Sequence, residues 1–323
     1  MTNDRPLILV SGKLISHVLT RLADRFDIKE IARPDAELLQ PDDRERVRGI
    51  AASFLGVPAS LIDALPNLEI IASYGVGYDA VDAGHAAEKT VVVTNTPDVL
   101  TDEVADTAIA LLLNTLRDFN RAERYLRDGS WPDGPFPLSK GTLRNRRVGI
   151  FGMGRIGLAI ARRLEGFGVA IAYHNRRPVD GVPYTYHATL GDLAAACDTL
   201  INVAPATAQT TRAVDAAILQ ALGEDGVFIN VGRGATVDEE ALIEALQART
   251  ILAAGLDVFA NEPHVPQALL DADNAVLLPH VASASQHTRK AMADLLVDNL
   301  ESWFDRGEAL TPVPETAAIS RKA

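Results

Sequence analysis

The sequence predicts an α/β protein built from two parallel-sheet domains, and three observations point to this fold class. Short apolar runs alternate with amphipathic helical patterns along the whole chain. A segment rich in Pro and Gly, residues 130–141, interrupts the alternation, which then starts again. The length of 323 residues exceeds that of an ordinary single domain and suits two. Strands that alternate with helices imply parallel pairing within each sheet.

The first part of the chain contains apolar runs too short for helices, which we interpret as strands at 6–10, 49–53, 68–73 and 90–95. The pattern over 13–26 predicts an amphipathic helix. A longer helix is predicted over 101–129, because acidic residues follow Thr101 and Gly129 provides a stop. Residues 130–141 are predicted to be a loop.

After this loop the alternation of strands and helices is more regular. We expect strands at 146–152, 169–175, 198–204, 226–232, 251–259 and 275–282. Helical patterns cover 155–167, 238–249 and 285–307. The residues from about 100 to 285 therefore form one α/β unit, and the N-terminal residues form another.

Composition excludes several classes of function. The net charge is −12, from 31 basic and 43 acidic residues without a basic block, so we expect no binding to nucleic acid or to an anionic membrane. The single cysteine, Cys197, cannot form an intrachain disulfide and is predicted to be a buried apolar residue, not a nucleophile. No run is long enough for a membrane span or a signal peptide, which predicts a cytoplasmic protein. We expect no metal site, since no His, Cys and Asp residues cluster at ligand spacing.

The glycine pattern "GMGRIG" predicts a dinucleotide site. It lies between a predicted strand and a predicted helix and supplies Gly152, Gly154 and Gly157. The first glycine allows a tight turn, the second lets the backbone approach a pyrophosphate, and the third lets helix and strand pack closely. The phosphates would face the positive end of the following helix.

The stretch "YHNRRP" at the end of the next strand favours NADP(H) over NAD(H). An NAD site usually has an acidic residue here that binds the ribose hydroxyls, but this chain has Asn175, followed by Arg176 and Arg177. Asparagine does not repel a 2′-phosphate, and arginines form charge-assisted hydrogen bonds with it. The alternative is a solvated basic turn without a ligand.

Three further stretches carry candidate catalytic residues. They are "NVGRG" with Arg233, "GLDVFANEP" with Asp257 and Glu262, and "LLPHVASAS" with His280. Each alone has an ordinary structural explanation, such as a surface charge or a core histidine.

Together with "YGVGYDAVD" (74–82), "VADTAIALLL" (104–113) and the glycine pattern, these stretches make the chain resemble the D-isomer-specific 2-hydroxyacid dehydrogenase family. The similarity covers nearly the whole chain and includes order and spacing. Within the family it is most like the NADP-dependent glyoxylate/hydroxypyruvate reductases.

The resemblance implies two doubly wound domains with the active site in the cleft between them. A Rossmann NAD(P)-binding domain, residues 99–285, would be inserted in a flavodoxin-like substrate-binding domain formed by residues 1–98 and 286–323. Hinges would lie near residues 97–98 and 280–285. The family also implies a homodimer through the 101–130 region, where the predicted helix is more apolar than one core face requires.

The implied activity is NADPH-preferring reduction of a small 2-oxo acid, glyoxylate or hydroxypyruvate, to the D-2-hydroxy acid. His280 would be the general acid, and Glu262 would orient its ring. Arg233 would bind the substrate's oxygens, together with His280 and the backbone amides of Val76 and Gly77. Leu55 would help to set substrate size. Contacts with the cofactor would come from Gly152, Gly154, Arg155, Ile156, Gly157, Asn175, Arg176, Arg177, Val203, Ala204, Pro205, Val231, Gly232 and Asp257.

Several alternatives remain at this stage. A 2-ketogluconate (2-ketoaldonate) reductase of the same family has similar motifs. A function of another class is a dehydrogenase-like, nucleotide-gated scaffold protein. Such a scaffold would have less need of Arg233, Glu262 and His280, so their presence favours an enzyme. An enzyme like adenosylhomocysteine hydrolase would be longer, and formate dehydrogenases carry glutamine in place of Glu262. Long phosphoglycerate dehydrogenases have an additional regulatory domain. The short phosphoglycerate dehydrogenases, which lack it, remain an alternative. In some relatives an aromatic residue from the partner subunit closes the site, and Trp131 and Phe136 are the candidates for this role here, which stays open.

Overall fold

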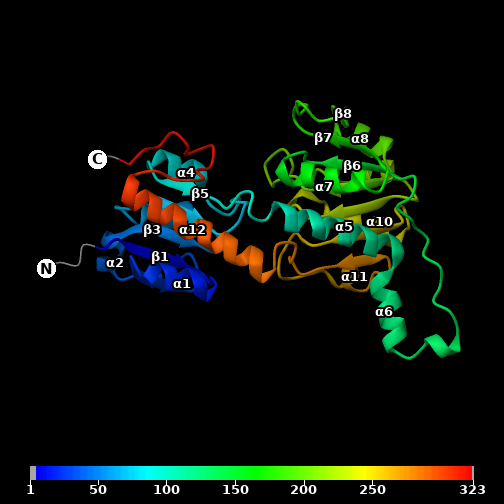
Figure 1. Ribbon diagram of the computed structural model, residues 1–323, viewed down its shortest axis with the longest axis horizontal. Helices are drawn as coiled ribbons and strands as arrows, with labels where there is room; N and C mark the ends of the chain where they lie inside the picture. Colours follow the sequence, from blue (N-terminus) through cyan, green and yellow to red (C-terminus); the bar gives the residue numbers. More distant parts are fainter. Residues whose placement is uncertain (1–4, 322–323) are drawn as a thin grey trace. The chain divides into compact units, whose positions relative to one another are not determined.

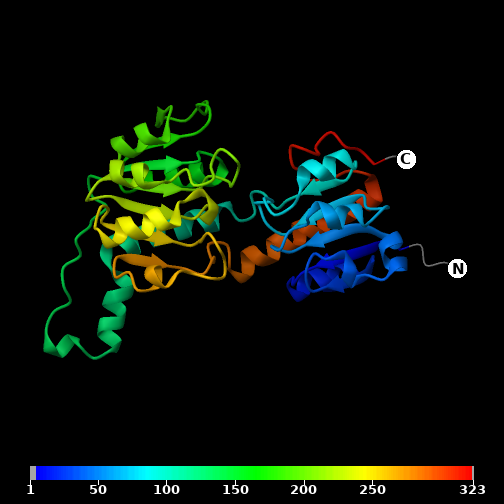
Figure 2. The same cartoon turned by 180° about the vertical axis from the view of Figure 1, so that it is seen from behind.

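The computed structural model describes residues 5–321, and the chain divides into two compact units (Figures 1 and 2). Unit 1 contains the N-terminal part of the chain up to Leu100 and resumes at Ser285. Unit 2 is Thr101–Ala284 and is therefore inserted into the sequence of unit 1.

Unit 1 is a doubly wound domain whose described residues form a five-stranded sheet in the order β2-β1-β3-β4-β5. All of its strand pairs are parallel, and this order is that of flavodoxin-like folds. Helices α1 and α12 pack on one face, while α3 and α4 contribute to the core on the other. The strands are β1 (Leu7–Ser11), β2 (Asp27–Ile31), β3 (Val47–Ala52), β4 (Ile70–Ser73) and β5 (Val92–Thr94). The helices are α1 (Ser16–Ala23), α2 (Pro41–Arg46), α3 (Ala59–Asp63), α4 (Ala83–Glu88) and α12 (Gln286–Arg306), with a 3₁₀ turn at Ala36–Leu38.

Unit 2 has a seven-stranded parallel sheet in the order β12-β11-β10-β9-β6-β7-β8. Counted from β6, this is the Rossmann order with one additional strand, and the order reverses between β6 and β9. The strands are β6 (Arg147–Phe151), β7 (Ala170–His174), β8 (Thr185–His187), β9 (Thr199–Asn202), β10 (Val227–Asn230), β11 (Ala253–Leu256) and β12 (Ala275–Leu277).

Helices cover both faces of the unit 2 sheet. Helices α5 (Thr101–Arg117) and α7 (Arg155–Glu165) pack together on the face toward the viewer in Figure 1, and α10 (Glu239–Gln247) lies on the face seen in Figure 2. With α10 are α8 (Leu190–Ala196) and α9 (Ala216–Leu222). The remaining elements are α6 (Phe119–Arg127), α11 (Gln267–Leu270) and 3₁₀ turns at Trp131–Asp133 and Gly234–Thr236. Because both faces are covered, central strands such as β6 and β10 are apolar and buried.

The predicted fold class of two parallel-sheet α/β domains is confirmed, but some elements differ. The helix predicted over 101–129 is two helices, since Asp118 adopts a left-handed conformation (φ 54°) and separates α5 from α6. Strands β2 and β8 were not predicted. Both lie at sheet edges, where one side of the strand needs no partner and polar sequences such as "DIKEI" are tolerated.

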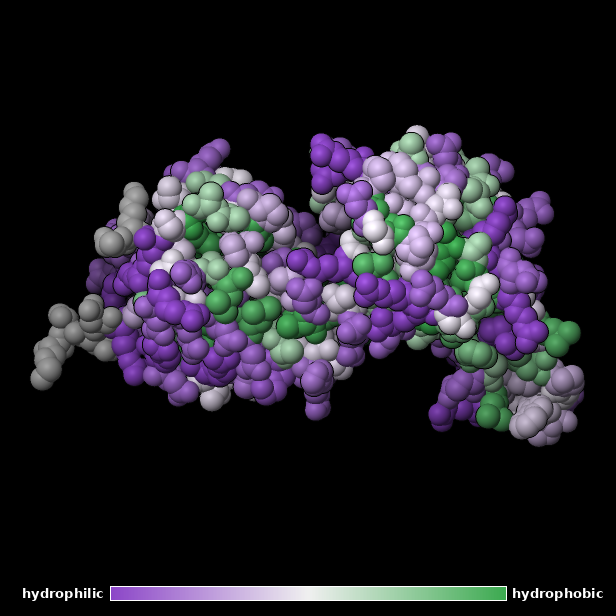
Figure 3. Space-filling model, turned by 45° about the horizontal axis from the view of Figure 1, so that its top comes forward, coloured by the Kyte–Doolittle hydropathy of each residue, from purple (hydrophilic) through white to green (hydrophobic). Residues whose placement is uncertain are grey.

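The apolar residues of α5 and α6 have different surroundings. Most of those of α5, including Ile109, Leu111 and Leu112, are buried inside unit 2. Ala110 is exposed and Leu113 is half-buried, and a dimer contact through this helix stays a prediction. In α6, by contrast, none of the nine described residues is buried. This helix and the loop after it extend from the body of unit 2 (Figure 1), and apolar residues are visible on them in Figure 3.

Candidate active site

The glycine turn between β6 and α7 has the geometry of a phosphate-binding turn. Gly152 has φ +105°, and a Cβ atom there would lie 2.8 Å from the amide nitrogen of Ala204. A Cβ on Gly157 would lie 2.2 Å from the carbonyl oxygen of Gly152, so the helix packs directly against the turn. No heavy atom of residues 5–321 lies within 4 Å of the corresponding position at Gly154, which leaves open space at the start of α7. The turn thus places the first amides of α7 beside an open volume.

The predicted cofactor residues of the next two loops lie beside this turn. Val203, Ala204 and Pro205 follow β9, and Val231 and Gly232 follow β10. A Cβ on Gly232 would lie 2.9 Å from the carbonyl oxygen of Ala204, so these two loops are in close contact. The carboxyl ends of three neighbouring strands therefore meet where the strand order reverses, which is where doubly wound sheets bind ligands.

Asn175 stands where an NAD site usually has an acidic residue, and its side chain also makes two hydrogen bonds with the glycine turn. Its Oδ1 accepts a hydrogen bond from the amide of Met153 at 2.6 Å, and its Nδ2 donates to the carbonyl oxygen of Met153 at 3.3 Å. The side chain thereby ties the end of β7 to the middle of the glycine turn. Arg176 and Arg177 follow it, are exposed, and make no hydrogen bond or ion pair with any residue in the described range 5–321.

His280 and Glu262 form the central pair of the candidate catalytic site. The ring Nδ1 of His280 lies 2.7 Å from Oε2 of Glu262, and the side chains are 43% and 35% exposed. The amide of Phe259 donates to the other carboxylate oxygen at 3.0 Å. Burial opposes ionisation of Glu262, but the bonds from His280 and Phe259 and the nearby charge of Arg233 outweigh it and lower the pKa of Glu262. Glu262 can therefore accept a hydrogen bond from Nδ1 of His280 and fix the orientation of the ring, with Nε2 on the side away from Glu262.

Asp257 fixes the loop that carries His280. Its side chain is fully buried, and its two carboxylate oxygens accept hydrogen bonds from the amides of Val281 at 2.7 Å and Ala282 at 3.0 Å. The amide of His280 donates to the carbonyl oxygen of Asp257 at 2.8 Å. His280 has φ 52°, an uncommon value for a non-glycine residue, and these three bonds hold it there. Burial raises the pKa of Asp257 above its ordinary value, with the two amides acting in the opposite direction.

Arg233 is held through its backbone by a buried polar network. Asn202 donates to Oδ1 of Asn230 at 3.0 Å and to the hydroxyl of Thr236 at 2.6 Å. Thr236 and Asn230 in turn donate to the carbonyl oxygen of Arg233, at 2.6 and 3.3 Å. The same asparagines accept hydrogen bonds from the amides of Ala204 and Gly232. The network therefore connects the arginine with the two cofactor loops.

Asn202 and Asn230 are not among the predicted site residues, although the sequence contains a signal for them. The tripeptide "INV" occurs at 201–203 and again at 229–231. The two copies are paired in register on β9 and β10, with Asn202 opposite Asn230. A polar residue repeated at the ends of two buried strands could have indicated a shared function.

The predicted substrate residues Leu55, Val76 and Gly77 belong to unit 1. Residues 75–77 form a loop after β4, held by hydrogen bonds from the Asn95 side chain to the carbonyl oxygen of Val76 at 2.7 Å and from the Thr96 amide to that of Gly75 at 3.0 Å. Leu55 is 56% exposed after β3. Both segments follow carboxyl ends of strands, and their role in substrate binding stays a prediction.

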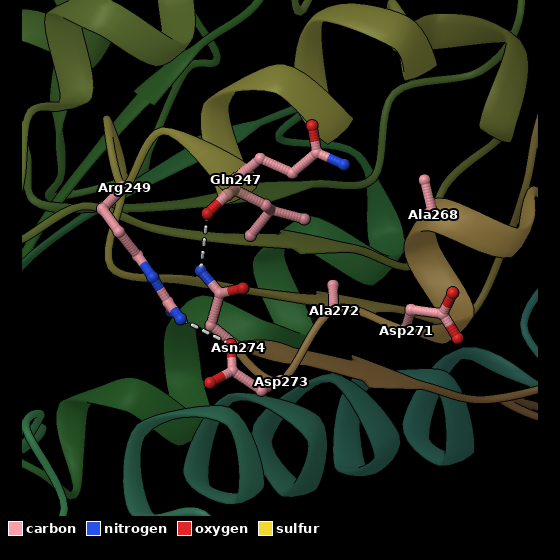
Figure 4. A pocket seen from close by; sticks show the side chains of 8 residues that line it. Gln247, Arg249, Ala268, Asp271, Ala272, Asp273 and Asn274 are labelled. Carbon is pink, nitrogen blue, oxygen red and sulfur yellow. Dashed lines mark hydrogen bonds and ion pairs between the residues drawn. The ribbon is translucent and has the colours of Figure 1, made fainter.

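A different hollow on unit 2 lacks catalytic groups. It is lined by Leu246, Gln247, Arg249, Ala268, Asp271, Ala272, Asp273 and Asn274 (Figure 4). These residues precede β11 and β12, so the hollow lies at the amino ends of the strands. Its polar groups bind each other: Arg249 donates a hydrogen bond to Asp273, and the Asn274 side chain donates one to the carbonyl oxygen of Leu246.

Other sequence predictions concern cysteine, metals and membranes. Cys197 is buried, and burial raises the pKa of its thiol to about 11, which makes the thiolate rare at neutral pH. Within residues 5–321 no group of three or more His, Cys, Asp or Glu side chains could hold a metal ion. None of the helices in this part of the chain has the length and apolar character that a membrane span requires.

Comparison with known proteins identifies the family. Residues 109–282 match the NAD-binding domain of the D-isomer specific 2-hydroxyacid dehydrogenases. The chain belongs to this family. It is 44% identical to a glyoxylate/hydroxypyruvate reductase of Arabidopsis thaliana over 95% of this chain and 98% of that protein. It is 42% identical to a 2-ketogluconate reductase of Gluconobacter oxydans over 83% of this chain and 86% of that one.

Solved structures of the family agree with the fold. The chain matches the NADPH-dependent glyoxylate/hydroxypyruvate reductase of Sinorhizobium meliloti, in complex with NADP and malonate, with a TM-score of 0.97 and 60% identity. The match covers 99% of this chain and 100% of the other. As a member of this family, the protein is an oxidoreductase with an NAD(P)-binding domain in unit 2. The resemblance inferred from the motifs is confirmed.

Proposed function

We propose that the protein reduces a small 2-oxo acid, either glyoxylate to its achiral 2-hydroxy acid or hydroxypyruvate to the D-2-hydroxy acid, and that it prefers NADPH to NADH. The observation that carries the chemistry is the hydrogen bond between His280 and Glu262 beside Arg233. An acid, its orienting carboxylate and a cation are the groups that reduction of a 2-oxo acid requires. Relatives that carry the names of these activities support the substrate class.

The residues of unit 2 fit a dinucleotide. The turn at Gly152 and Gly157 tolerates no side chain, and the space at Gly154 is open. The amides at the start of α7 would bind the pyrophosphate, and Arg176 and Arg177 would bind a 2′-phosphate. When bound, the reduced nicotinamide supplies the hydride. The loops at Val203–Pro205 and Val231–Gly232 would border it.

His280 would donate the proton that the reduction requires. Because Nδ1 is bound to Glu262, the proton leaves from Nε2 and passes to the substrate's carbonyl oxygen. Glu262 stabilises the protonated ring before transfer and keeps it oriented afterwards. Asp257 keeps the histidine in its strained backbone conformation through the amides of Val281 and Ala282.

Arg233 would bind the substrate's carboxylate and carbonyl oxygens and so hold the carbon that is reduced in position. The buried network of Asn202, Asn230 and Thr236 binds the backbone carbonyl of Arg233 and so supports its position. In unit 1, the amides of Val76 and Gly77 would bind the same carboxylate, and Leu55 would limit the size of its substituent.

The cofactor preference is tested with the double variant Arg176→Ala/Arg177→Ala. Initial rates with NADPH and NADH are measured at saturating glyoxylate or hydroxypyruvate. Loss of two charge-assisted contacts of about 1.5 kcal/mol each should reduce the NADPH preference roughly 100-fold, with little change for NADH. The control is Arg162→Ala, an exposed arginine near the opposite end of α7. Equal use of both cofactors by the wild type, or no effect of the double variant, would show that this turn does not select NADPH.

The substrate is tested with glyoxylate, hydroxypyruvate, hydroxyphenylpyruvate and 2-ketogluconate as separate oxidants of NADPH. The highest kcat/KM identifies the preferred acid, and a clear excess for 2-ketogluconate would replace the proposed substrate with this alternative. If no 2-oxo acid is turned over while NADPH still binds, the scaffold function is favoured.

We also propose a homodimer formed through the 101–130 region, with α6 and the following loop as the contact. A nine-residue helix without a buried face gains little stability alone, so a second copy of the chain would cover it. Exposed apolar side chains on this segment are Phe119, Leu126, Trp131 and Leu138. Leu126→Glu should convert a dimeric mass in light scattering to a monomeric one, whereas Leu310→Glu, an exposed leucine of unit 1, should not. A monomeric wild type would refute the dimer.

A further inference from the structure

Two tyrosines face each other at the edge of the unit 2 sheet, on the strands that precede and follow the turn with Arg176 and Arg177. Tyr173 on β7 and Tyr186 on β8 are register partners, and their ring centroids are 5.5 Å apart. Tyr173 is one of the largest fully buried side chains, although it carries a hydroxyl. A buried hydroxyl requires hydrogen-bond partners, so the positions of those partners indicate what the tyrosine does.

The two hydroxyls bind the two ends of the turn that carries Arg176 and Arg177. The Tyr186 hydroxyl donates to the carbonyl oxygen of Asn175 at 3.2 Å, just before the arginines. The amide of Val179, just after them, donates to the Tyr173 hydroxyl at 2.9 Å. That hydroxyl can donate in turn to the carbonyl oxygen of Val179, at 3.5 Å.

The residue before the turn is anchored as well. The Asn175 side chain makes two hydrogen bonds with the backbone of Met153. One position earlier, the ring of His174 stacks on Phe151 at 5.7 Å, and its Nδ1 is 2.9 Å from the carbonyl oxygen of His187. The backbone on both sides of the arginines is therefore held, while the arginine side chains themselves bind none of the residues 5–321.

We propose that Tyr173 and Tyr186 are positioning residues that preorganise the 175–179 turn, so that Arg176 and Arg177 meet the 2′-phosphate of NADPH without first ordering their backbone. This inference rests on the proposed NADPH preference. Arginine side chains lose considerable rotamer freedom when they bind a phosphate. If the backbone had to be ordered too, much of the gain from the charged contacts would be lost.

The test variant is Tyr186→Phe, which removes one hydroxyl from a partly buried ring and keeps the ring pair with Tyr173. We expect the ratio of kcat/KM for NADPH to that for NADH to fall about 2- to 10-fold, the range of one net hydrogen bond. The change should lie in KM for NADPH, with kcat and the NADH constants unaltered. The matched control is Tyr184→Phe, two residues away, whose hydroxyl donates to Glu165 at 2.8 Å and not to the turn.

A merely structural role is distinguished by repeating Tyr186→Phe in the Arg176→Ala/Arg177→Ala background. If the tyrosine acts through the arginines, it should have no further effect there on the cofactor ratio. An equal loss with both cofactors, or a full additional loss in this background, would overturn the inference. Tyr173→Phe is the second variant, and it should lower the ratio in the same direction.

The two proposals fail in different ways. If the double arginine variant lowers the NADPH preference but Tyr186→Phe and Tyr173→Phe both resemble the wild type, only the tyrosine inference is wrong. If the double arginine variant keeps the preference of the wild type, the proposed role of the turn is wrong, and the inference falls with it.

Discussion

Replacing Glu262 by Gln should weaken the proposed acid without changing its position. Gln can still accept the hydrogen bond from the Phe259 amide, which is 3.0 Å from the present carboxylate. It has no negative charge for His280, whose Nδ1 is now 2.7 Å from Oε2. A hydrogen bond between charged groups contributes about 1.5–3 kcal/mol, and the partial exposure of both side chains favours the lower part of that range. Because about 1.4 kcal/mol corresponds to a factor of ten, kcat should fall roughly 10-fold to 30-fold.

The assay is the pH dependence of kcat for reduction of the preferred 2-oxo acid. The loss should be smallest at low pH, where Glu262 of the wild type, whose pKa is lowered by its bonds to His280 and Phe259, becomes protonated and loses its charge too, and it should be fully present above that range. KM should change much less, because Arg233 and the backbone amides of Val76 and Gly77 would still bind the substrate's carboxylate. Glu239→Gln is the control, since Glu239 accepts a hydrogen bond from the neighbouring Ala260 amide at 3.0 Å. If Glu262→Gln has the activity and pH profile of the wild type, or behaves like Glu239→Gln, the assignment of the pair is refuted.

Three further predictions concern single side chains. Asn175→Asp should raise KM for both NADPH and NADH and should not shift the preference to NADH. The reason is that a carboxylate cannot donate a hydrogen bond to the carbonyl oxygen of Met153. A lower KM for NADH would contradict this. Burial opposes ionisation of Asp294, but hydrogen bonds from Lys290, His17 and Arg21 outweigh it and lower its pKa to about 2. This stabilisation is present above the ordinary aspartate range and is lost as the pH falls through about 4 toward 2, so Asp294→Asn should cost about 1 kcal/mol in urea unfolding at pH 7 and less at pH 3. Cys197, with a thiol pKa raised by burial to about 11, should react with a disulfide reagent at pH 8 more than about 100-fold slower in the native protein than after unfolding; comparable rates would be contrary to its burial.

Most of the fold could be predicted because parallel sheets leave a strong pattern. Their central strands are buried on both faces and appear in the sequence as short apolar runs, as in β6 and β10. Motifs that follow such strands then lie at one edge of a sheet, and this is where the structure places Gly152, Arg233 and His280. What could not be predicted was β2 and β8, whose edge positions make the apolar pattern weak.

The details of the site depended on hydrogen bonds that composition does not reveal. From the sequence, Asn175 is only an uncharged residue at a position that is often acidic. In the structure its amide matches both backbone groups of Met153, which an aspartate would not. The division at Asp118 was hidden as well, because the helical pattern continues through it and only the backbone conformation shows the break. Most apolar residues of α5 belong to the core of unit 2, and the helical pattern alone does not show which of them are buried.

The charge of the chain illustrates how local geometry decides anion binding. A net charge of −12 disfavours polyanions, yet the proposed ligands are all anions. At physiological ionic strength, salt screens the interaction between exposed charges that are more than about 8 Å apart. Anion binding therefore depends mainly on the groups that contact the anion. Arg163 shows what a structural arginine looks like, since Asp102 and Asp106 neutralise it at 3.0 and 2.6 Å. Arg176 and Arg177 have no such carboxylates among residues 5–321, and their backbone is held at both ends. Two adjacent arginines on a turn held at both ends, without counterions among residues 5–321, are what the proposed 2′-phosphate site requires.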